Sequence, residues 1–474
     1  MSRKSFLVLL ISAMCSIILV PAFVHQVAAK ESVLGSAYEE LKLFADVVAL
    51  VRKNYVNEVN MKDLAEGAVK GMLQSLDPHS SYMDQESFNE LQVETKGEFG
   101  GLGIEINVKD GILTVIAPIE GSPAETAGVQ AGDQIIKVGD EFTKNMTLID
   151  AVKKMRGPKG SPITLTVHRE NKPELIPITI LRDVIRVQSV RSRMLEQGFG
   201  YVRLAQFQEE SGKELREAIE KLNGKGADRQ LKGLVIDLRN DPGGLLSQAV
   251  ETADIFLKEG LVVYTDGRLE SQKQKFYAQD DKNEPQLPIV VLINGGSASA
   301  AEILAGALQD AKLALVVGTQ SFGKGSVQTV LPMDNGSALR LTTALYYTRN
   351  GRSIQARGIT PDVVVPARRF LSDQEELLEE DEVKFFPRSE GELPGAIKNP
   401  QQQGKGENIE REMTGSTVLP IGSRLAMEAN LDKLFKEDPQ LEEAMKLLRN
   451  WYAMKQMPKA QTAAVNLNQA ENQS

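Results

Sequence analysis

The spacing of apolar residues divides the chain into three regions. Between residues 36 and 95, apolar positions recur every three or four residues, which predicts helices with one apolar face. The stripe of the first helix comprises Leu41, Phe44, Val48, Val51 and Tyr55. Between 97 and 182, short β-rich runs alternate with Gly and Asp turns, which predicts a small β domain. From about 185 to 368, apolar runs such as LKGLVIDLRN and PIVVLINGG each precede a helical stretch, which predicts buried strands in a layered α/β sheet.

The start of the chain predicts an exported protein. Arg3 and Lys4 precede the apolar run FLVLLISAMCSIILVPAFV, and small residues follow at Val27 and Ala29. This pattern favours a cleaved signal peptide over residues 1–29. An uncleaved membrane anchor is the alternative, because the run approaches the ~20 residues that span a bilayer. In both cases we expect the protein in the periplasm or cell envelope.

The end of the chain predicts a linker and a helical tail. Residues 371–415 are acidic and rich in Pro, Gly and Gln, which is typical of a linker or a mobile surface segment. In the helical region 416–455, DPQLEEAMKLLRNWY predicts a helix with Asp438 as its N-cap. We expect residues 456–474 to be disordered. The apolar face of the helix needs a partner in the main body or in another subunit, and it consists of Leu441, Met445, Leu448 and Tyr452.

Composition narrows the function classes. The 474 residues are 42% hydrophobic and 25% charged, which is sufficient for several domains with sizeable cores. The net charge of −9 and the lack of a basic cluster argue against nucleic-acid binding. The single cysteine, Cys15, lies in the predicted signal peptide. We therefore expect no disulfide and no cysteine metal site, and the motifs imply no metal, nucleotide or other cofactor.

Two motifs carry candidate chemistry. INGGSASAAEILAGALQD places Ser297 and Ser299 between a predicted strand and a predicted helix. Ser299 and Glu302 also have the spacing of a capping box, so this motif alone favours a helix cap over a nucleophile. Further along, FGKGSVQ holds a lysine between two glycines, which suits close approach of the backbone to a site. If this segment is a strand, one of its faces carries Lys324, Ser326 and Gln328.

Lysine is the better-placed base for a nucleophilic serine. The chain has three histidines, namely His25 in the predicted signal, His79 in the helical region and His168 at the end of the β domain. A Ser-His-Asp triad would need one of them to fold back onto the α/β core. A lysine has an ordinary pKa of about 10.4, burial lowers it, and a shift of ~3 units costs roughly 4 kcal/mol. Gln328 would hold the neutral amine by hydrogen bonding without adding a charge.

An acyl intermediate also needs an oxyanion hole. LRNDPGGLL supplies Gly243 and Gly244 just before a predicted helix, where backbone N–H groups lack helical partners. The N–H of Ala300, directly after the serine, is the natural second donor.

These motifs, together with GMLQSLDPHSSYM and GRSIQARGITPDVVVP, resemble the carboxyl-terminal processing peptidases, also called tail-specific proteases. The resemblance runs from about Phe44 to Val365. It implies a crotonase-like α/β protease core over 183–370, an inserted PDZ domain over 97–182 and an N-terminal helical region over 30–96 that forms a possible dimerisation arm.

The resemblance also assigns roles. In that family the nucleophile is the serine 25 residues before the motif lysine, which selects Ser299 over Ser297. The base and its supporting glutamine fall on Lys324 and Gln328. The sequence departs from many relatives at Ala301, where they carry a third serine, and this change should not affect the chemistry.

Within the predicted β domain, GGLGI and GSPAETAGVQAGDQIIKVGD resemble the PDZ signature. A glycine-rich loop can turn successive N–H groups toward a terminal carboxylate, and the next strand edge can accept a peptide. The resemblance further implies that Arg156 helps to align the active site when substrate is bound. The alternative is a small β domain that binds nothing. The predicted peptide-binding residues are Gly101, Leu102, Gly103 and Ile104.

The sequence thus predicts a secreted serine endopeptidase of Ser/Lys type that recognises protein C-termini and cleaves near them, in processing or quality control. Expected partners are proteins with exposed apolar C-termini, further copies of the chain and an adaptor bound through the termini. One alternative is a non-catalytic peptide-binding scaffold on the same fold. An acyl-processing enzyme of the crotonase type is another, although small acyl substrates have no use for a peptide receptor.

Overall fold

The computed structural model describes most of the chain between residues 38 and 456, as two compact units, 1–73 and 74–474. The predicted signal peptide and the predicted disordered tail beyond 456 lie outside the described residues. Within the described part, no helix combines the length and the apolar character needed to cross a bilayer. The described ranges are 38–109, 111–119, 121–170, 172–196, 198–224, 231–366, 389–401 and 438–456.

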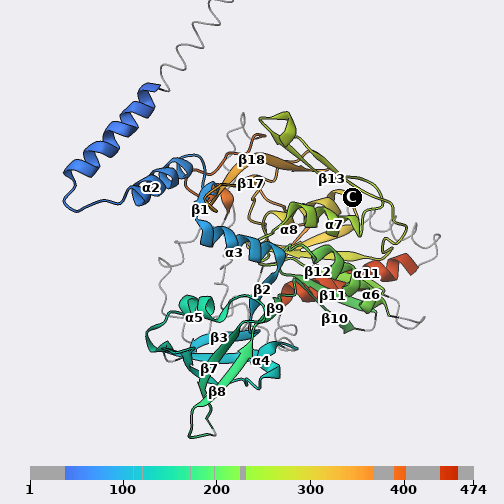
Figure 1. The fold of residues 1–474 in the computed structure, drawn as a ribbon. Helices are drawn as coiled ribbons and strands as arrows, with labels where there is room; N and C mark the ends of the chain where they lie inside the picture. The colour runs from blue at the N-terminus through green and yellow to red at the C-terminus, as the bar shows by residue number, and fades with distance from the viewer. Residues whose placement is uncertain are drawn as a thin grey trace, which may run out of the picture. The chain divides into compact units, whose positions relative to one another are not determined.

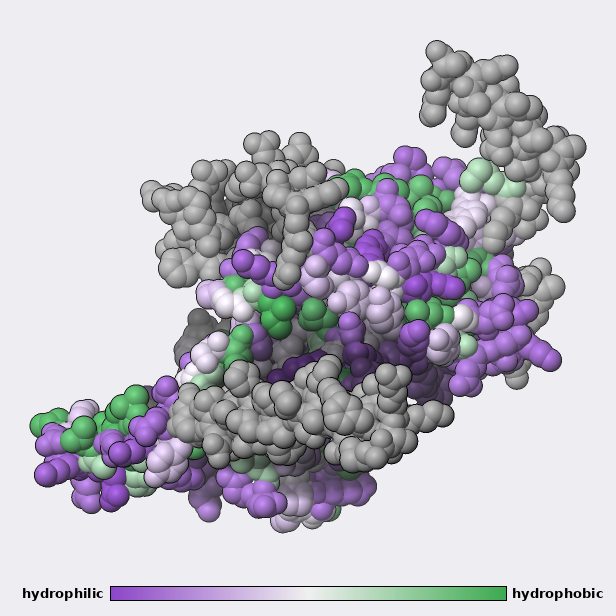
Figure 2. Space-filling model, turned by 90° about the horizontal axis from the view of Figure 1, so that it is seen from above, coloured by the Kyte–Doolittle hydropathy of each residue, from purple (hydrophilic) through white to green (hydrophobic). Residues whose placement is uncertain are grey.

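The first unit is helical, as its apolar period predicts. Residues 38–54 form one helix, and α2 (Met61–Gln74) begins the next (Figure 1). Three of the five residues of the predicted stripe are exposed, since Leu41 is 68%, Phe44 51% and Tyr55 61% accessible, and the other two are half-buried. Hydrophobic residues are visible on the surface of this arm, at the left of Figure 2. An exposed apolar stripe of this kind is typical of a surface that binds another chain.

A six-stranded sheet forms the centre of the second unit and confirms the predicted layered α/β core. Its strand order is β10-β11-β12-β15-β16-β19, with β10 antiparallel to β11 and every other pair parallel. Figure 1 labels its first three strands, β10, β11 and β12. The strands are β10 (Val190–Glu196), β11 (Phe199–Leu204), β12 (Gly233–Asp237), β15 (Ile289–Ile293), β16 (Ala314–Gly318) and β19 (Val363–Val364).

Helices cover both faces of this sheet. In β15, alternate residues pack on opposite sides. Ile289, Val291 and Ile293 pack into the core shared with α6, α7 and α8, whereas Val290 and Leu292 pack toward α11. Alternate side chains of a strand point to opposite faces, which explains the continuous apolar run. The helices are α6 (Ser211–Asn223), α7 (Leu246–Asp254) and α8 (Ala300–Asp310) on one face, and α11 (Pro439–Gln456) on the other.

The C-terminal helix finds its partner in the main body. The predicted N-cap is confirmed, because Asp438 Oδ1 accepts the N–H groups of Gln440 (3.0 Å) and Leu441 (3.1 Å). Asp438 also pairs with Arg239, which binds the buried Asp237 at 2.6 Å. Of the predicted apolar face, the fully covered members are Leu441, Met445 and Leu448.

A second sheet lies beside the core and receives the chain from the N-terminal side. Its order is β1-β18-β13-β14, with β17 paired to β18. The helix α3 (Gln85–Lys96) follows β1 and precedes the β domain in the chain. Short 3-10 turns occur elsewhere in the chain, at η1 (Thr143–Asn145), η3 (Glu270–Gln272) and η5 (Glu390–Glu392). The strands are β1 (Ser81–Met83), β13 (Gly260–Gly267), β14 (Lys275–Ala278), β17 (Ser326–Pro332) and β18 (Ala338–Thr348).

The predicted β domain has its own sheet and core. Its order is β3-β4-β5-β7-β8, with β6 paired to β5, and its fully buried residues include Ile135 and Leu165. The strands β2 (Glu98–Gly101) and β9 (Asp183–Arg186) pair with each other where the chain enters and leaves the domain. The other elements are β3 (Ile104–Lys109), β4 (Ile112–Pro118), β5 (Gln134–Val138), β6 (Glu141–Phe142), β7 (Pro162–His168), β8 (Ile176–Leu181), α4 (Pro123–Thr126) and α5 (Leu148–Met155).

Part of the segment predicted as a polar linker is packed against the core. Residues 389–401, which we call the strap, contain the buried residues Glu390 and Asn399. The side-chain amide of Asn399 donates to the carbonyl of Gln355 (2.8 Å), and Gln401 accepts the N–H of Ser353 (3.0 Å). The strap is therefore a folded part of the core rather than a surface linker.

Candidate active site

The candidate nucleophile lies at a strained turn at the edge of the core sheet. Residues 294–299, the serine turn, connect β15 to α8. Ser299 directly precedes α8 and has φ of +56° and ψ of −115°. A non-glycine residue with positive φ is uncommon and is often found at functional sites. A sharp strand-to-helix turn also presents the nucleophilic serine of the α/β-hydrolases.

The neighbouring serine is occupied by the fold. The Ser297 hydroxyl donates to the carbonyl of Leu238 (2.7 Å) and accepts the N–H of Asn294 (3.0 Å), and its side chain is fully buried. These bonds close the serine turn onto the end of β12. Ser297 is therefore a structural residue, and Ser299 remains the candidate nucleophile.

Glu302 joins the serine turn to the segment that carries the lysine. Its carboxylate is fully buried, and Oε2 accepts the N–H groups of both Ser299 (2.9 Å) and Lys324 (2.9 Å). The other oxygen, Oε1, accepts from Ser321 Oγ (2.5 Å) and Gly323 N (2.7 Å). The bond to Ser299 is the one expected of a capping box, and the remaining three extend it into a bridge between two loops.

Lys324 lies in a loop whose backbone is fully held. Residues 322–325, the lysine loop, precede β17, so Lys324 is not on the strand itself. The flanking glycines allow close backbone contact, because a Cβ on Gly325 would lie 2.4 Å from the nitrogen of Gln355. Gln355 also accepts the Gly325 N–H (2.9 Å). The buried hydroxyl of Tyr346 donates to the Lys324 carbonyl and contacts the Ser299 side chain.

The environment of Lys324 destabilises its ammonium form relative to a lysine in water. Burial lowers the pKa of this lysine below its ordinary value, and the nearby charge of Arg340 lowers it further. The carboxylates of Glu390, Glu302 and Asp77 act in the opposite direction without reversing the shift. A lysine with a lowered pKa can accept a proton near neutral pH. The predicted effect of burial on the base is thus present.

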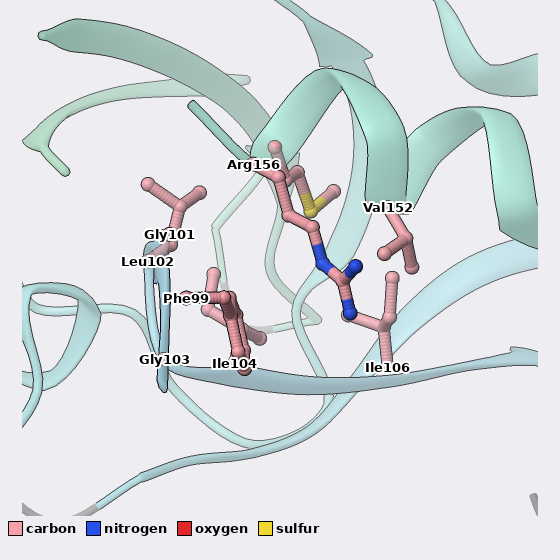
Figure 3. Close-up of a pocket in the computed structure, with 9 residues that line it drawn as sticks. Phe99, Gly101, Leu102, Gly103, Ile104, Ile106, Val152 and Arg156 are labelled. Atoms are coloured by element: carbon pink, nitrogen blue, oxygen red, sulfur yellow. The ribbon is translucent and has the colours of Figure 1, made fainter. Parts of the chain in front are cut away.

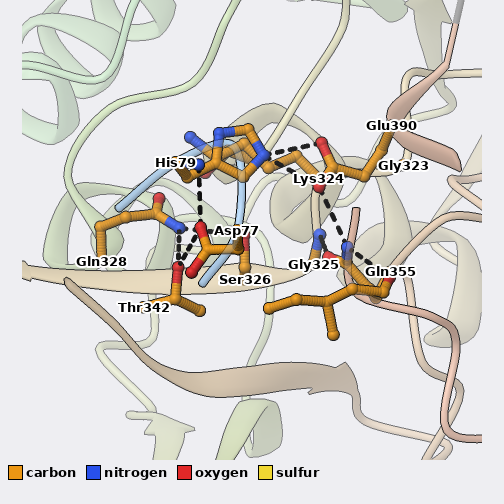
Figure 4. Close-up of polar contacts among 12 residues, drawn as sticks. Asp77, His79, Gly323, Lys324, Gly325, Ser326, Gln328, Thr342, Gln355 and Glu390 are labelled. Atoms are coloured by element: carbon orange, nitrogen blue, oxygen red, sulfur yellow. Dashed lines mark hydrogen bonds and ion pairs between the residues drawn. The ribbon is translucent and has the colours of Figure 1, made fainter. Parts of the chain in front are cut away.

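Gln328 lies beside this loop with bonds that differ from those expected. Its amide nitrogen donates to Ser326 Oγ (2.9 Å) and to Thr342 Oγ1 (3.4 Å), and Thr342 in turn donates to Asp77 (3.1 Å), as Figure 4 shows. A bulge between Val327 and Gln328 interrupts the pairing of β17 with β18. In this structure Gln328 is thus held by Ser326 and Thr342 rather than by Lys324, and Thr342 connects it to residues 77–80, which we call the DPHS turn.

The two predicted glycines contribute differently to the oxyanion hole. The Gly243 N–H donates to Asp241 (2.8 Å), so this group is occupied and the predicted donor role is wrong for this conformation. Gly243 provides space instead, since a Cβ there would lie 2.7 Å from Ser299 Cβ and 2.8 Å from Ala300 N. Gly244 follows, and Ala300 starts α8, where its N–H has no helical partner. These last two amides remain the candidate donors.

The predicted peptide-binding residues line a pocket in the β domain. Gly103 has φ of +74°, and a Cβ there would lie 2.3 Å from Ser122 Cβ. The Arg156 guanidinium lies 4.7 Å from the centre of the Phe99 ring, and its Nε has no hydrogen-bond partner among the described residues. Figure 3 shows this charge in an otherwise apolar pocket lined by Phe99, Gly101, Leu102, Gly103, Ile104, Ile106, Val152, Met155 and Arg156.

Sequence reasoning missed several residues of this site. It treated Glu302 only as a cap, and it gave no role to Asp77, His79 or Tyr346. The strap residue Glu390 was assigned to a linker. The motif DPHSSYM could have indicated Asp77 and His79 as site residues. It gathers polar and charged residues in one turn, and the packing of the neighbouring helices does not explain them.

Comparison with known proteins identifies the domains. Residues 198–365 match peptidase family S41, residues 90–168 match the PDZ domain, and residues 21–87 match the N-terminal domain of the activating protease CtpB. The carboxy-terminal-processing protease of Bartonella bacilliformis is 45% identical over 414 residues, covering 87% of this chain and 89% of that protein.

Two further relatives carry similar names. The carboxy-terminal processing protease CtpA of Bacillus subtilis is 38% identical over 331 residues, covering 70% of this chain and 68% of that protein. Among solved structures, the photosystem II D1 C-terminal processing protease is 31% identical, with a TM-score of 0.40, and covers 66% of this chain and 86% of that one. The predicted family and the predicted protease core with an inserted PDZ domain are confirmed. The chain belongs to the carboxy-terminal processing proteases of peptidase family S41, which are serine proteases.

Proposed function

We propose that this protease uses a Ser/Lys mechanism to cleave proteins near C-termini that its PDZ domain recognises. The observation that carries the proposal is the single Glu302 oxygen that accepts the N–H groups of both Ser299 and Lys324 at 2.9 Å. One carboxylate therefore fixes the backbones of the candidate nucleophile and the candidate base relative to each other. Fixed geometry between reacting groups is a large part of enzymatic rate enhancement.

The proposed reaction passes through an acyl-enzyme. Lys324 Nζ takes the proton of Ser299 Oγ as this oxygen bonds to the scissile carbonyl carbon. The N–H groups of Gly244 and Ala300 stabilise the oxyanion. The carbon–nitrogen bond breaks as the lysine ammonium gives its proton to the leaving amine. Lys324 then takes a proton from water, the water oxygen attacks the ester carbon, and the proton returns to Ser299 as the acid product leaves.

The PDZ pocket supports recognition of an apolar C-terminus. Its lining is apolar except for Arg156, whose unpartnered Nε suits a peptide carbonyl or carboxylate. We propose that the backbone N–H groups of Leu102, Gly103 and Ile104 bind the terminal carboxylate, and that the edge of β3 accepts the peptide as an added strand. We also propose that Arg156 helps to align the active site when substrate is bound. In this structure Arg156 lies in the PDZ pocket, so we treat this role as distinct from its contact with the peptide.

The cleavage experiment compares the full chain with Ser299→Ala and Lys324→Ala, using a protein substrate with an apolar C-terminus and mass spectrometry of the products. We expect cleavage by the wild type and none by either variant. The matched control is Ser297→Ala, which removes the neighbouring hydroxyl and should retain cleavage at the same sites wherever it folds. Undiminished cleavage by Lys324→Ala would contradict the mechanism.

The binding experiment uses a fluorescent peptide with an apolar C-terminus and the same peptide ending in an amide. Fluorescence anisotropy should show binding of the carboxylate form to Ser299→Ala protein and weaker binding of the amide. Equal affinity for both forms would contradict carboxylate recognition.

We also propose export to the periplasm or cell envelope and self-association through the helical residues 38–54. The N-terminal signal pattern supports the first proposal, and the exposed apolar stripe supports the second. Sedimentation of the mature chain and of a Leu41→Ser/Phe44→Ser variant tests the assembly. A smaller species for the variant is expected, and an unchanged sedimentation coefficient would contradict the proposed interface.

A further inference from the structure

The strap reaches the lysine loop through its second residue. The Glu390 N–H donates to the carbonyl of Phe322 (3.0 Å), two residues before Lys324. The Glu390 side chain is fully buried, which is exceptional for a carboxylate without a structural reason. Glu390 lies far beyond Lys324 in the sequence, and the fold of the strap brings it to the lysine loop.

The Glu390 carboxylate connects His79 to Gln355, and Gln355 contacts the lysine loop. His79 Nε2 lies 2.8 Å from each of its oxygens, and Gln355 Nε2 donates to Oε1 (3.0 Å), as Figure 4 shows. Gln355 uses its own carbonyl oxygen to accept the Gly325 N–H (2.9 Å). The strap therefore holds the lysine loop on both sides of Lys324, directly at residue 322 and through Gln355 at residue 325.

Charged groups on four elements influence the pKa of the Lys324 amine. Arg340 on β18 disfavours the ammonium, whereas Glu390 on the strap, Glu302 on α8 and Asp77 in the DPHS turn favour it. Burial acts with Arg340 and dominates, so the pKa of Lys324 is lowered overall. Charges act strongly at such a site because the surrounding dielectric is low.

We propose that Glu390 is a positioning residue for the lysine base: from the strap, it ties the DPHS turn and Gln355 to the lysine loop and places a negative charge beside the amine. The proposal rests on the proposed Ser/Lys mechanism. It means that the active site is completed by a segment beyond the S41 match at residues 198–365. The protease core is thus incomplete without the strap.

The test is the pH dependence of kcat/KM for Glu390→Gln, measured on a quenched fluorescent peptide. The acidic limb of this profile reports deprotonation of the base in the free enzyme. Removing the carboxylate charge removes an effect that favours the ammonium, so the limb should move to lower pH, by roughly half a unit to one unit. We also expect kcat on the plateau to fall about tenfold, because the glutamine cannot accept all the bonds of the carboxylate.

Two further variants serve as an opposite-charge test and as a control. Arg340→Gln removes a positive charge near the same amine, so its acidic limb should move to higher pH. Glu392→Gln removes a carboxylate from the same 3-10 turn, but this residue is exposed, so its profile should match the wild type. A merely structural role of Glu390 would lower activity at every pH and leave the limb in place.

The outcomes separate the two proposals. If Glu390→Gln folds and its acidic limb is unmoved while Lys324→Ala is inactive, the role of Glu390 is overturned and the mechanism stands. If Lys324→Ala is active, the mechanism falls and the role of Glu390 with it. If Glu390→Gln lacks the near-UV circular dichroism of the wild type, Arg340→Gln tests the premise that charges near the amine set the acidic limb, and an unmoved limb in that variant overturns the proposal.

Discussion

Replacing Glu302 by glutamine is the sharpest test of how the site is held together. The side chain is nearly unchanged in size, so no cavity is created. The hydrogen bonding changes, because a carboxylate accepts on both oxygens whereas a glutamine amide accepts on one and donates on the other. Glu302 has four donors around it, namely the backbone N–H groups of Ser299, Gly323 and Lys324 and the hydroxyl of Ser321.

The magnitude follows from counting the donors that lose an acceptor. If the glutamine nitrogen faces Ser321 and Gly323, the Ser321 hydroxyl can reorient and only the Gly323 N–H is left unsatisfied. If it faces Ser299 and Lys324, two N–H groups are left. A buried unsatisfied polar group costs about 1–3 kcal/mol. We therefore expect the free energy of unfolding to fall by about 1–3 kcal/mol in the better orientation.

Activity should fall more than stability suggests. The Gly323 N–H directly precedes Lys324, so its loss loosens the backbone that carries the base. A displacement of about 1 Å at a catalytic group can cost ~100-fold in rate, and we expect a decrease of that order in kcat with little change in KM. Urea denaturation and steady-state cleavage of a fluorogenic peptide measure the two quantities.

The control is Glu214→Gln on α6. This carboxylate also accepts several bonds, from Ser189 N (3.0 Å), Ser189 Oγ (2.8 Å) and Val190 N (3.1 Å), but none from the serine turn or the lysine loop. It should lose stability and keep kcat. Wild-type kcat in Glu302→Gln, or an equal loss of kcat in Glu214→Gln, would refute the argument.

Three other predictions follow from single features. Gly243→Ala should reduce kcat by about 100-fold or more, because its Cβ would lie 2.7 Å from Ser299 Cβ and fill the oxyanion site; peptide anisotropy should be unchanged. Burial raises the pKa of Glu302 from 4.5 to about 7. The unfolded chain therefore loses this proton first, so about 3 kcal/mol of stability that is complete below pH 4.5 is lost as pH rises to about 7. Glu302→Gln should lack this dependence in urea titrations, and its stability and kcat are compared with those of the wild type above pH 7, where Glu302 is ionised. Leu448→Ala, at a fully buried position of α11, should cost about 2–5 kcal/mol by urea denaturation, whereas Met454→Ala, on the exposed side, should cost little.

The period of apolar residues predicts most of the core. The apolar run of β15 is continuous because both faces of the strand are covered, and the cap at Asp438 follows from its own neighbours in sequence. Such features depend on local composition and on burial alone. They are visible in a single chain without knowledge of its contacts.

The bridging carboxylates could not be predicted in this way. The capping-box spacing accounts for one of the four bonds to Glu302, and the other three come from residues that only the folded chain brings near. Glu390 lies in a stretch whose acidic composition is typical of a linker, and its burial depends on His79 and Gln355. The start of β17 also depends on tertiary contact, because Gly323 and Gly325 pack on the backbone of residues 355–358.

The position of α11 has a consequence for partly made or clipped chains. One entire face of the central sheet is covered by a helix that ends only at Gln456. A product that stops at residue 366 would keep Ser299 and Lys324 but lack the strap, and it would leave Val290 and Leu292 open to water. We expect such a fragment to aggregate, so that damage at the carboxyl end of this protease disables the whole molecule.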